Sequence, residues 1–382
     1  KELRRKGRKV IGEIELGYIV SVPYKVPWYA ITGTNGKSTT TKLLELMFLK
    51  DGKRIIAGGN IGNAITSEIK DALEGGYLAD LEAVVVEVSS FQIETMERFT
   101  PRVAAILNVT PDHLDRYASF NEYREVKLGI AKNQSGEDLL VLNRDDPFLR
   151  DVDGRVKARR FYFTASSPVE DPLPHGFVEG GNLCVRVGGE VEKLVHETEV
   201  KIKGRHNIEN ALAASLMAIS GGVNLKSIAG VLREFTGLPH RMEYVGSCEG
   251  VEFYNDSKGT NVGAVLKAVS GFETGLVLIL GGRDKDGDFR PLRRYLGNPI
   301  RNVVLMGEAG QKIYEHLGMP DNAVITRDMG EAVEIAFRLA DRGDTVLLSP
   351  GCASFDQYEN FMERGEDFKR IVREIREGIH AH

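Results

Sequence analysis

The sequence predicts an α/β fold with two parallel-sheet domains. Three observations support this prediction. A glycine-rich turn, Thr32 to Thr39, follows the apolar run Tyr29-Ala30-Ile31 and precedes a helix that should start near Ser38. Apolar runs typical of buried strands alternate with helical periods from Trp28 to about Gly222. After the Gly and Pro residues at Gly237 to His240, a second α/β rhythm begins.

The glycine-rich turn has the composition of a phosphate-binding loop (P-loop). Gly33 and Gly36 let backbone N–H groups approach phosphate oxygens, and the helix N-terminus adds partial positive charge. Lys37 can reach the β- and γ-phosphates of a nucleotide, and the Ser38 hydroxyl can hold Mg²⁺. The match is incomplete because Ile31 stands where the full pattern has glycine, and the alternative is a plain strand-to-helix turn. The predicted nucleotide-binding residues here are Gly33, Thr34, Asn35, Gly36, Lys37, Ser38 and Thr39.

Length and composition bound the remaining possibilities. The 382 residues are enough for two or three domains. A net charge of −5 gives no sign of nucleic-acid binding. Cys184, Cys248 and Cys352 stand far apart, which fits a reducing cytoplasm. No apolar run approaches the roughly 20 residues of a membrane span. We expect a cytoplasmic monomer with no nucleic-acid partner and no membrane insertion.

In the first domain the apolar runs predict a doubly wound parallel sheet with an antiparallel insert. The predicted strands are Arg54–Ala57, Glu82–Val88, Val103–Val109 and Leu139–Leu142, the insert spans Gly176–Lys203, and the helices are His206–Ser220 and Leu225–Phe235. The second domain should be Rossmann-like. Its predicted strands are Leu276–Leu280, Val303–Met306 and Thr345–Leu348, and its helices are Gln311–Leu317, Met329–Asp341 and Tyr358–Glu377.

Polar residues follow several predicted strands, at the sheet edge where α/β proteins bind ligands. Glu87 could hold Mg²⁺, or it could be a solvated strand end. His113, among carboxylates, could be a metal ligand, a polar contact or neither. Lys127 lies on a helix and is by itself one exposed lysine among many. Asn207 and Asn210 share a helix face and could read an adenine edge or a phosphate, unless Asn207 caps the helix.

The second domain has three plausible binding loops, each of which could also be an ordinary turn. Asn255 to Asn261 brings a carboxylate, an ammonium and two hydroxyls together within seven residues. Gly281 to Asp286 and Ser349 to Asp356 each follow a buried strand. His240-Arg241 lies at the domain boundary.

Taken in order, these motifs resemble the Mur ligase family. They are GTNGKSTTT, GGNIG, EVSSFQIE, NVTPDHLDRY, YREVK, GRHNIENALAA, LPHRMEYV, YNDSKGTN and LSPGCASFDQYENFMERGEDF, and they extend from about Pro27 to the C-terminus. The last two, with EVSSFQ, look most like the branch that adds D-glutamate. The resemblance implies an ATP-dependent amide ligase of peptidoglycan precursor synthesis, which joins D-glutamate to UDP-N-acetylmuramoyl-L-alanine through an acyl phosphate.

The resemblance also implies roles for individual residues. Lys37, Ser38 and Glu87 would hold ATP phosphates and Mg²⁺, and His113 with a carbamylated Lys127 would hold a second Mg²⁺. The remaining implied contacts are Asn207, Asn210, Arg241 and Asp256 to the nucleotide, Lys258, Thr260, Lys285, Ser349 and Phe355 to D-glutamate, and Asn60 to the muramoyl substrate. The charges around Lys285 allow that assignment to slip by a residue or two. Contacts from two domains imply hinge closure around the substrates.

The start of the chain is expected to be the remnant of an N-terminal domain that binds the UDP end of the substrate. Lys1 to Glu13 is typical of the end of a helix, a turn and a short strand, although a natural basic helix is the alternative. The predicted domains are therefore 1–26 (remnant or linker), 27–238 (central P-loop ATP-binding domain) and 239–382 (C-terminal amino-acid-binding domain). Two alternative functions remain: a related ligase, such as a folylpolyglutamate-type enzyme, for another acceptor, or an ATP-binding fragment without turnover.

Overall fold

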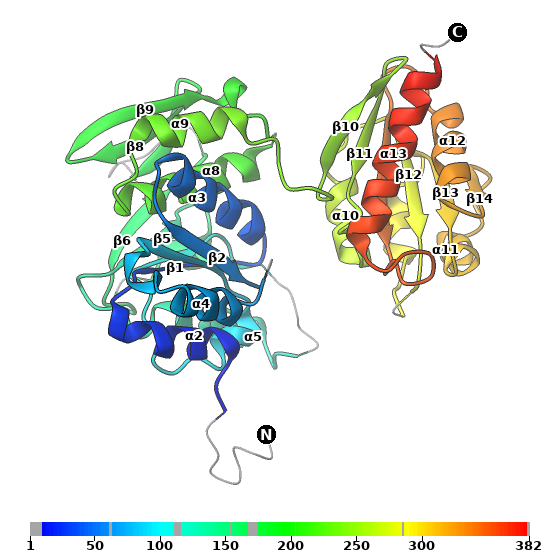
Figure 1. Ribbon diagram of the computed structural model, residues 1–382. Helices are drawn as coiled ribbons and strands as arrows, with labels where there is room; N and C mark the ends of the chain where they lie inside the picture. The colour runs from blue at the N-terminus through cyan, green and yellow to red at the C-terminus, as the bar shows by residue number, and fades with distance from the viewer. Residues whose placement is uncertain are drawn as a thin grey trace. The chain divides into compact units, whose positions relative to one another are not determined.

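The computed structural model describes residues 10–60, 63–110, 116–152, 154–166, 175–202, 204–284 and 286–379. The chain divides into two compact units, called here the N-terminal unit, which ends at Thr236, and the C-terminal unit, which begins at Gly237 (Figure 1). Each unit contains a largely parallel sheet with helices on both faces, so the predicted α/β fold class is confirmed.

The N-terminal unit is built on one nine-stranded sheet of order β2-β3-β1-β4-β5-β6-β7-β8-β9. Its parallel strands are β1 (Trp28–Thr32), β2 (Ile55–Gly59), β3 (Ala83–Glu87), β4 (Val103–Ile106), β5 (Leu139–Asn143) and β6 (Arg159–Phe163). The predicted antiparallel insert is formed by β7 (Gly176–Glu179), β8 (Asn182–Val187) and β9 (Glu190–His196). The central strands β1, β3 and β4 are buried throughout, as their continuous apolar runs predict.

Helices cover both faces of this sheet (Figure 1). On one face lie α3 (Lys37–Lys50), α8 (Arg205–Ser220) and α9 (Leu225–Glu234). The core of the other face contains Val84, Val86 and Ile106 together with residues of α2 (Glu13–Ser21), α4 (Ile65–Glu74), α5 (Ser90–Ile93), α6 (Phe120–Leu128) and α7 (Pro147–Arg150). Short 3₁₀ helices occur at Val22–Tyr24, Leu78–Asp80, Gly129–Ala131 and Glu197–Glu199.

The helix α2 is an integral part of the N-terminal unit. Its Glu15 side chain is fully buried and accepts backbone N–H bonds from the turn at Glu97, Arg98 and Phe99, at 3.1, 2.8 and 3.0 Å. The rings of Tyr18, Trp28 and Phe99 also meet edge to face, with centroids 5.3 to 5.8 Å apart. The expected short strand before Glu13 is wrong for the described residues 10–13, because a helix begins at Glu13.

The C-terminal unit has a six-stranded sheet of order β10-β11-β15-β12-β13-β14. The strands are β10 (Glu243–Cys248), which is antiparallel, and the parallel β11 (Val251–Asn255), β12 (Leu276–Gly281), β13 (Ile300–Met306), β14 (Ala323–Ile325) and β15 (Thr345–Gly351). The helices are α10 (Val262–Val269), α11 (Gly310–Leu317), α12 (Met329–Leu339) and α13 (Phe361–Ile379), with a 3₁₀ helix at Arg290–Tyr295.

Side-chain alternation gives this sheet two cores. Val277, Ile279 and Leu348 face the side of α12 and α13, whereas Leu276, Leu278 and Leu347 face the side of α10 and α11. Because β11, β12, β13, β14 and β15 are parallel, their carboxyl ends lie at one edge of the sheet. The loops after β11, β12, β13 and β15 lie at that edge. This edge contains the motifs that the sequence singles out in this unit.

Candidate functional site

The P-loop of the N-terminal unit connects β1 to α3. The residue preceding the helix is Gly36, with φ of 83°, a left-handed conformation that favours glycine. A Cβ atom on Gly36 would also lie 2.2 Å from Asn210 Oδ1, so any larger residue would clash there. The helix begins at Lys37, and its first N–H groups have no acceptor within the helix. This geometry presents donors and a helix N-terminus to an anion.

Two lysines converge on one carbonyl of this loop. Lys37 Nζ donates to Gly33 O and Thr34 O, each at 2.9 Å, and Lys127 Nζ donates to the same Gly33 O at 2.8 Å. Lys127 is only 1% exposed, so the view of it as one exposed lysine among many is wrong. Two ammonium groups that share a carbonyl repel each other, and an anion placed between them would relieve this repulsion.

Glu87, at the end of β3, is a buried carboxylate with an unsatisfied oxygen. Its Oε1 accepts a bond from Asn60 Nδ2 at 2.8 Å, whereas Oε2 has no hydrogen-bond partner in the part of the chain that the structure describes. The side chain is 1% exposed, so the alternative of a solvated strand end is wrong. Leaving such an oxygen buried and unpaired is costly, and a bound cation would satisfy it. Glu87 and Ser38 therefore have the donor chemistry that Mg²⁺ prefers.

Asn207 and Asn210 lie in the first turns of α8. Asn210 is buried, its Nδ2 donates to Asn207 Oδ1 at 3.2 Å, and its Oδ1 accepts from Thr40 Oγ1 of α3 at 3.3 Å. The two amides are thus neighbours, as their spacing predicts. The alternative in which Asn207 caps the helix is wrong, because α8 begins at Arg205 and Gly204 is its N-cap.

Asn108 is a contact residue of the P-loop that the sequence reasoning did not single out. It follows β4, and its side chain forms two hydrogen bonds with Asn35: Asn35 N donates to Oδ1 at 2.8 Å, and Nδ2 donates to Asn35 O at 3.1 Å. Its backbone carbonyl accepts from Thr34 N at 2.9 Å. The NVTPDHLDRY motif contained this residue, but an asparagine after a strand gives no local signal of such a partner.

In the C-terminal unit, Asp256 and Ser349 meet although 93 residues separate them. Ser349 Oγ donates to Asp256 Oδ2 at 2.8 Å, and Met242 N donates to Oδ1 at 3.3 Å. Burial raises the pKa of Asp256 to about 6, against the lowering effect of these bonds. Ser349 is fully buried, so its hydroxyl acts on Asp256 in this structure.

A buried arginine of α13 connects two of the loops at this sheet edge. Arg364 Nε donates to Ser257 Oγ at 3.0 Å, and Nη2 donates to Ser257 O at 2.8 Å and to Cys352 O at 3.1 Å. The side chain is 1% exposed, and Nη1 has no hydrogen-bond partner among the described residues. Burial lowers the pKa of Arg364 to about 10, so it is charged at neutral pH. The sequence reasoning missed this residue.

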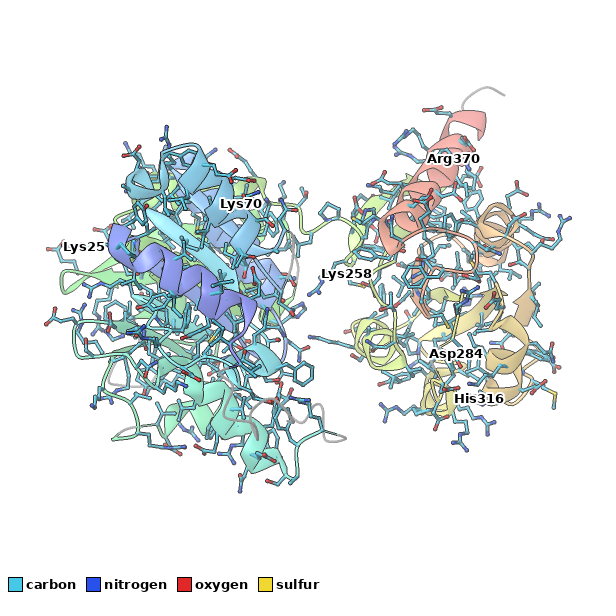
Figure 2. All side chains as sticks on the ribbon, turned by 60° about the horizontal axis from the view of Figure 1, so that its bottom comes forward. Lys25, Lys70, Lys258, Asp284, His316 and Arg370 are labelled. Carbon is cyan, nitrogen blue, oxygen red and sulfur yellow. The ribbon has the colours of Figure 1, made fainter. Side chains whose placement is uncertain are left out.

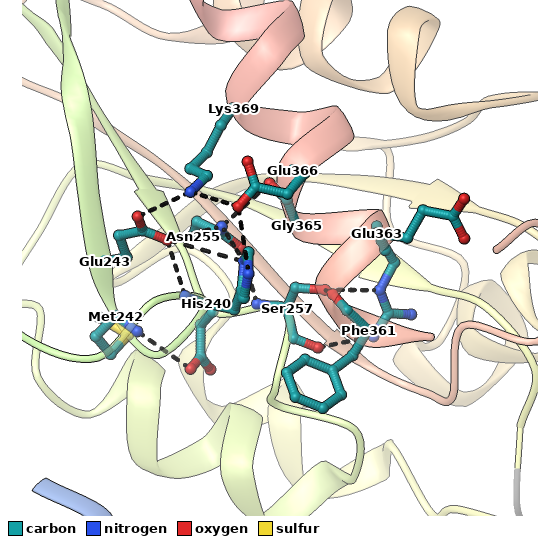
Figure 3. A network of polar contacts seen from close by, with 12 residues as sticks. His240, Met242, Glu243, Asn255, Ser257, Phe361, Glu363, Gly365, Glu366 and Lys369 are labelled. Atoms are coloured by element: carbon teal, nitrogen blue, oxygen red, sulfur yellow. Dashed lines mark hydrogen bonds and ion pairs between the residues drawn. The ribbon is translucent and has the colours of Figure 1, made fainter. Parts of the chain in front are cut away.

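Figure 3 shows a network of polar contacts that extends from Ser257 to His240 and Lys369. Fully buried Asn255 places Nδ2 within 3.0 Å of His240 Nδ1, 3.2 Å of Glu243 Oε2 and 3.2 Å of Gly365 O. Lys369 pairs with Glu243 at 3.1 Å and with Glu366 at 2.7 Å. Burial lowers the pKa of His240, which keeps its ring neutral at pH 7. These contacts fix the residue before Arg241 against β11 and α13.

The remaining predicted site residues that the structure describes in the C-terminal unit lie in its loops. Lys258 Nζ lies 5.6 Å from the centre of the Phe361 ring, and Thr260 N donates to Lys258 O at 2.9 Å. Phe355 is 58% exposed. Figure 2 shows Lys258 and Asp284 in the loops after β11 and β12, and Arg370 on α13. His113 and Lys285 lie outside the described residues.

The described residues contain neither a ready metal cluster nor a membrane-spanning helix. Among these residues, of which His113 is not one, no group of three His, Cys, Asp or Glu side chains is arranged to hold a metal ion. None of their helices is both long and apolar enough to cross a membrane.

Comparison with known proteins gives the family. Residues 31–218 match the model of the Mur ligase middle domain, and residues 240–352 match that of the Mur ligase glutamate ligase domain. The UDP-N-acetylmuramoylalanine–D-glutamate ligase of Thermoanaerobacter pseudethanolicus is 40% identical over 380 residues, which cover 98% of this chain and 81% of that protein. The chain belongs to the Mur ligase family.

Solved Mur ligase structures share the fold. MurF from Acinetobacter baumannii superposes with a TM-score of 0.67 at 18% identity, covering 94% of this chain and 80% of that one. The MurF ligase from Thermotoga maritima in complex with ADP gives 0.63 at 17% identity, covering 95% and 84%. At these identities the likeness establishes the fold alone. The two family models and the 40% identity to the Thermoanaerobacter ligase confirm the family resemblance predicted from the motifs.

Proposed function

We propose that this chain is an ATP-dependent ligase that joins D-glutamate to UDP-N-acetylmuramoyl-L-alanine in peptidoglycan precursor synthesis. The observation that supports it best is the 40% identity to a ligase of that name over 98% of the chain. The three free, buried cysteines fit the cytoplasmic location that we propose with it. The site supports the chemistry independently, because Lys37 and Lys127 meet at the P-loop beside a buried carboxylate.

The reaction has two steps. A carboxylate oxygen of the precursor attacks the γ-phosphorus of ATP, the bond to the β,γ-bridging oxygen breaks, and ADP leaves. The D-glutamate nitrogen then attacks the acyl carbon, the bond to the phosphate oxygen breaks, and the nitrogen loses a proton as the amide forms. Both steps bring anions together, so positive charge at the P-loop lowers their barriers. Lys37 and the N-terminus of α3 supply that charge here.

Mg²⁺ fits the residues present. Glu87, whose buried Oε2 has no partner among the described residues, and Ser38 would hold one ion, and His113 with carbamylated Lys127 would hold a second. Carbamylation would turn an ammonium into an anion, which would also remove the repulsion between Lys127 and Lys37. When bound, Mg²⁺ neutralises phosphate charge during transfer.

The other predicted residues divide between the substrates. Asn207, Asn210, Arg241 and Asp256 would contact the nucleotide, and Asn60 the muramoyl substrate. Lys258, Thr260, Lys285 and Phe355 would bind D-glutamate. Because Ser349 is fully buried against Asp256, we assign it the role of holding that carboxylate in place.

Phosphate release from ATP with Mg²⁺ tests the function. It is measured with the UDP-muramoyl-L-alanine precursor, with and without D-glutamate, and with L-glutamate as control. We expect release that requires D-glutamate. Lys37→Ala should reduce it roughly thousandfold, whereas Lys42→Ala is the matched control, since Lys42 lies on the same helix and pairs with Glu45 at the surface.

Other outcomes would contradict the proposal. Release that requires a different amino acid or a folate acceptor would indicate a related ligase. ATP binding without release under any of these conditions would indicate a nucleotide-binding protein without turnover.

A further inference from the structure

The P-loop is joined to the chain that follows β4 by a set of hydrogen bonds that we call the P-loop bridge, made of Thr34, Asn35, Asn108 and Thr110. In addition to the three Asn108 contacts, Thr34 Oγ1 donates to Thr110 O at 3.2 Å and accepts from Thr110 N at 3.1 Å. Strands β1 and β4 are paired up to Thr32 and Ile106. The bridge continues this pairing between the two segments that follow these strands, beyond the regular sheet.

The bridge decides which backbone donors face the nucleotide. The N–H groups of Thr34 and Asn35 both donate to Asn108, so they are not available to phosphate. The available donors are then those at the start of α3. The bridge also stabilises a loop that departs from the full P-loop pattern, because Ile31 stands at the position of the first glycine. The shape of the loop thus depends on contacts with Asn108 and Thr110, which lie outside the loop.

We propose that Asn108 and the Thr34 hydroxyl are positioning residues that hold the P-loop in the shape that accepts triphosphate. The inference rests on the proposed function, because it concerns the ATP site of that enzyme. Without the Asn108 amide, Asn35 loses a donor and an acceptor at once, and the peptide groups of the loop can rotate toward solvent. Part of the binding free energy of ATP is then used to order the loop, so the affinity for ATP falls.

The first test is ATP binding by calorimetry, with Mg²⁺, to the full chain and to Asn108→Ala. We expect the Kd for ATP and the KM for ATP to rise on the order of tenfold, from the loss of two hydrogen bonds. The KM for D-glutamate should not change, which a general loss of structure would not reproduce. Asn108→Asp should bind ATP more weakly still, because it adds a negative charge beside the triphosphate, and that extra loss should shrink at high salt.

Two further comparisons complete the test. Thr34→Val removes the hydroxyl and should weaken ATP binding, whereas Thr34→Ser keeps it and should recover most of that loss. Asn133→Ala is the matched control: its amide also forms two hydrogen bonds with backbone groups, donating to Glu97 O at 2.8 Å and to Phe99 O at 3.0 Å, but away from the P-loop. It should bind ATP as the unaltered chain does.

The outcomes separate this inference from the proposed function. If the unaltered chain binds no ATP, the proposed function fails. If it binds ATP and both Asn108→Ala and Thr34→Val bind it equally well, the positioning role is wrong. Equal losses in Thr34→Val and Thr34→Ser would also contradict it, since the hydroxyl would then be irrelevant. If Asn108→Ala does not fold, the Thr34 pair decides.

Discussion

Glu87 and Asp256 occupy comparable places in the two units, because each is a buried carboxylate at the carboxyl end of a parallel strand. Glu87 has one oxygen bonded to Asn60 and one without a partner among the described residues. Asp256 has both oxygens bonded, to Ser349 and to the Met242 N–H. The first leaves an oxygen for the Mg²⁺ that we propose, whereas the second is already satisfied by the protein. The difference teaches that burial alone does not distinguish the two carboxylates, whereas the hydrogen bonds to their oxygens do.

Among the variants that bear on this comparison, Glu87→Gln should have the largest effect on the rate of phosphate release. Glu87→Gln should reduce phosphate release by a factor on the order of a hundred or more, because the cation would lose a charged ligand. In the absence of nucleotide and Mg²⁺ the same change should raise the free energy of unfolding by about 1 kcal/mol, because a neutral amide is cheaper to bury than an unpaired carboxylate. Phosphate release and denaturation by urea measure the two effects. An unchanged rate would contradict the comparison.

Arg364 tests the bonded network of the C-terminal unit. Arg364→Met should lower the free energy of unfolding of this unit by about 4 kcal/mol, because Ser257 and Cys352 lose their buried donors. Trp28 is the single tryptophan and lies in the N-terminal unit. In a urea titration of Arg364→Met, circular dichroism should therefore show that the C-terminal unit unfolds at a lower urea concentration. Trp28 fluorescence, which reports on the N-terminal unit, should not shift.

The control for this variant lies on the same helix. Arg370 is half exposed and pairs with Asp367 and Glu374, so Arg370→Met should cost about 0.5 kcal/mol at most. A similar loss in both variants would mean that the buried bonds of Arg364 contribute nothing special.

The dependence of stability on pH tests the role of Asp256. Its folded pKa is about 6 instead of 3.8, so between these values the folded state binds more protons than the unfolded state. Its contribution to stability is therefore complete below pH 3.8 and is lost as the pH rises through 6, a change of about 3 kcal/mol. Asp256→Asn should flatten that part of the profile of the C-terminal unit, measured by urea denaturation at each pH. An unaltered slope would contradict the raised pKa.

The sequence could predict what is encoded locally. The P-loop turn, the buried strands and the acidic end of β3 are each visible within ten residues. Lys127 could be placed at the site only through the family resemblance, because its burial comes from contact with Gly33, 94 residues away. Asn108 and Arg364 were missed for the same reason, since their partners are 73 and 107 residues away.

The helix α2 has a practical consequence for dividing the chain. A boundary drawn from the nucleotide-binding motif would start a fragment at Pro27 and discard Glu15 and Tyr18. The turn at 97–99 would then lose the carboxylate that binds its three N–H groups, and Trp28 would lose its cover. Such a fragment should be insoluble or aggregate during expression, whereas one that begins before Glu13 retains both contacts.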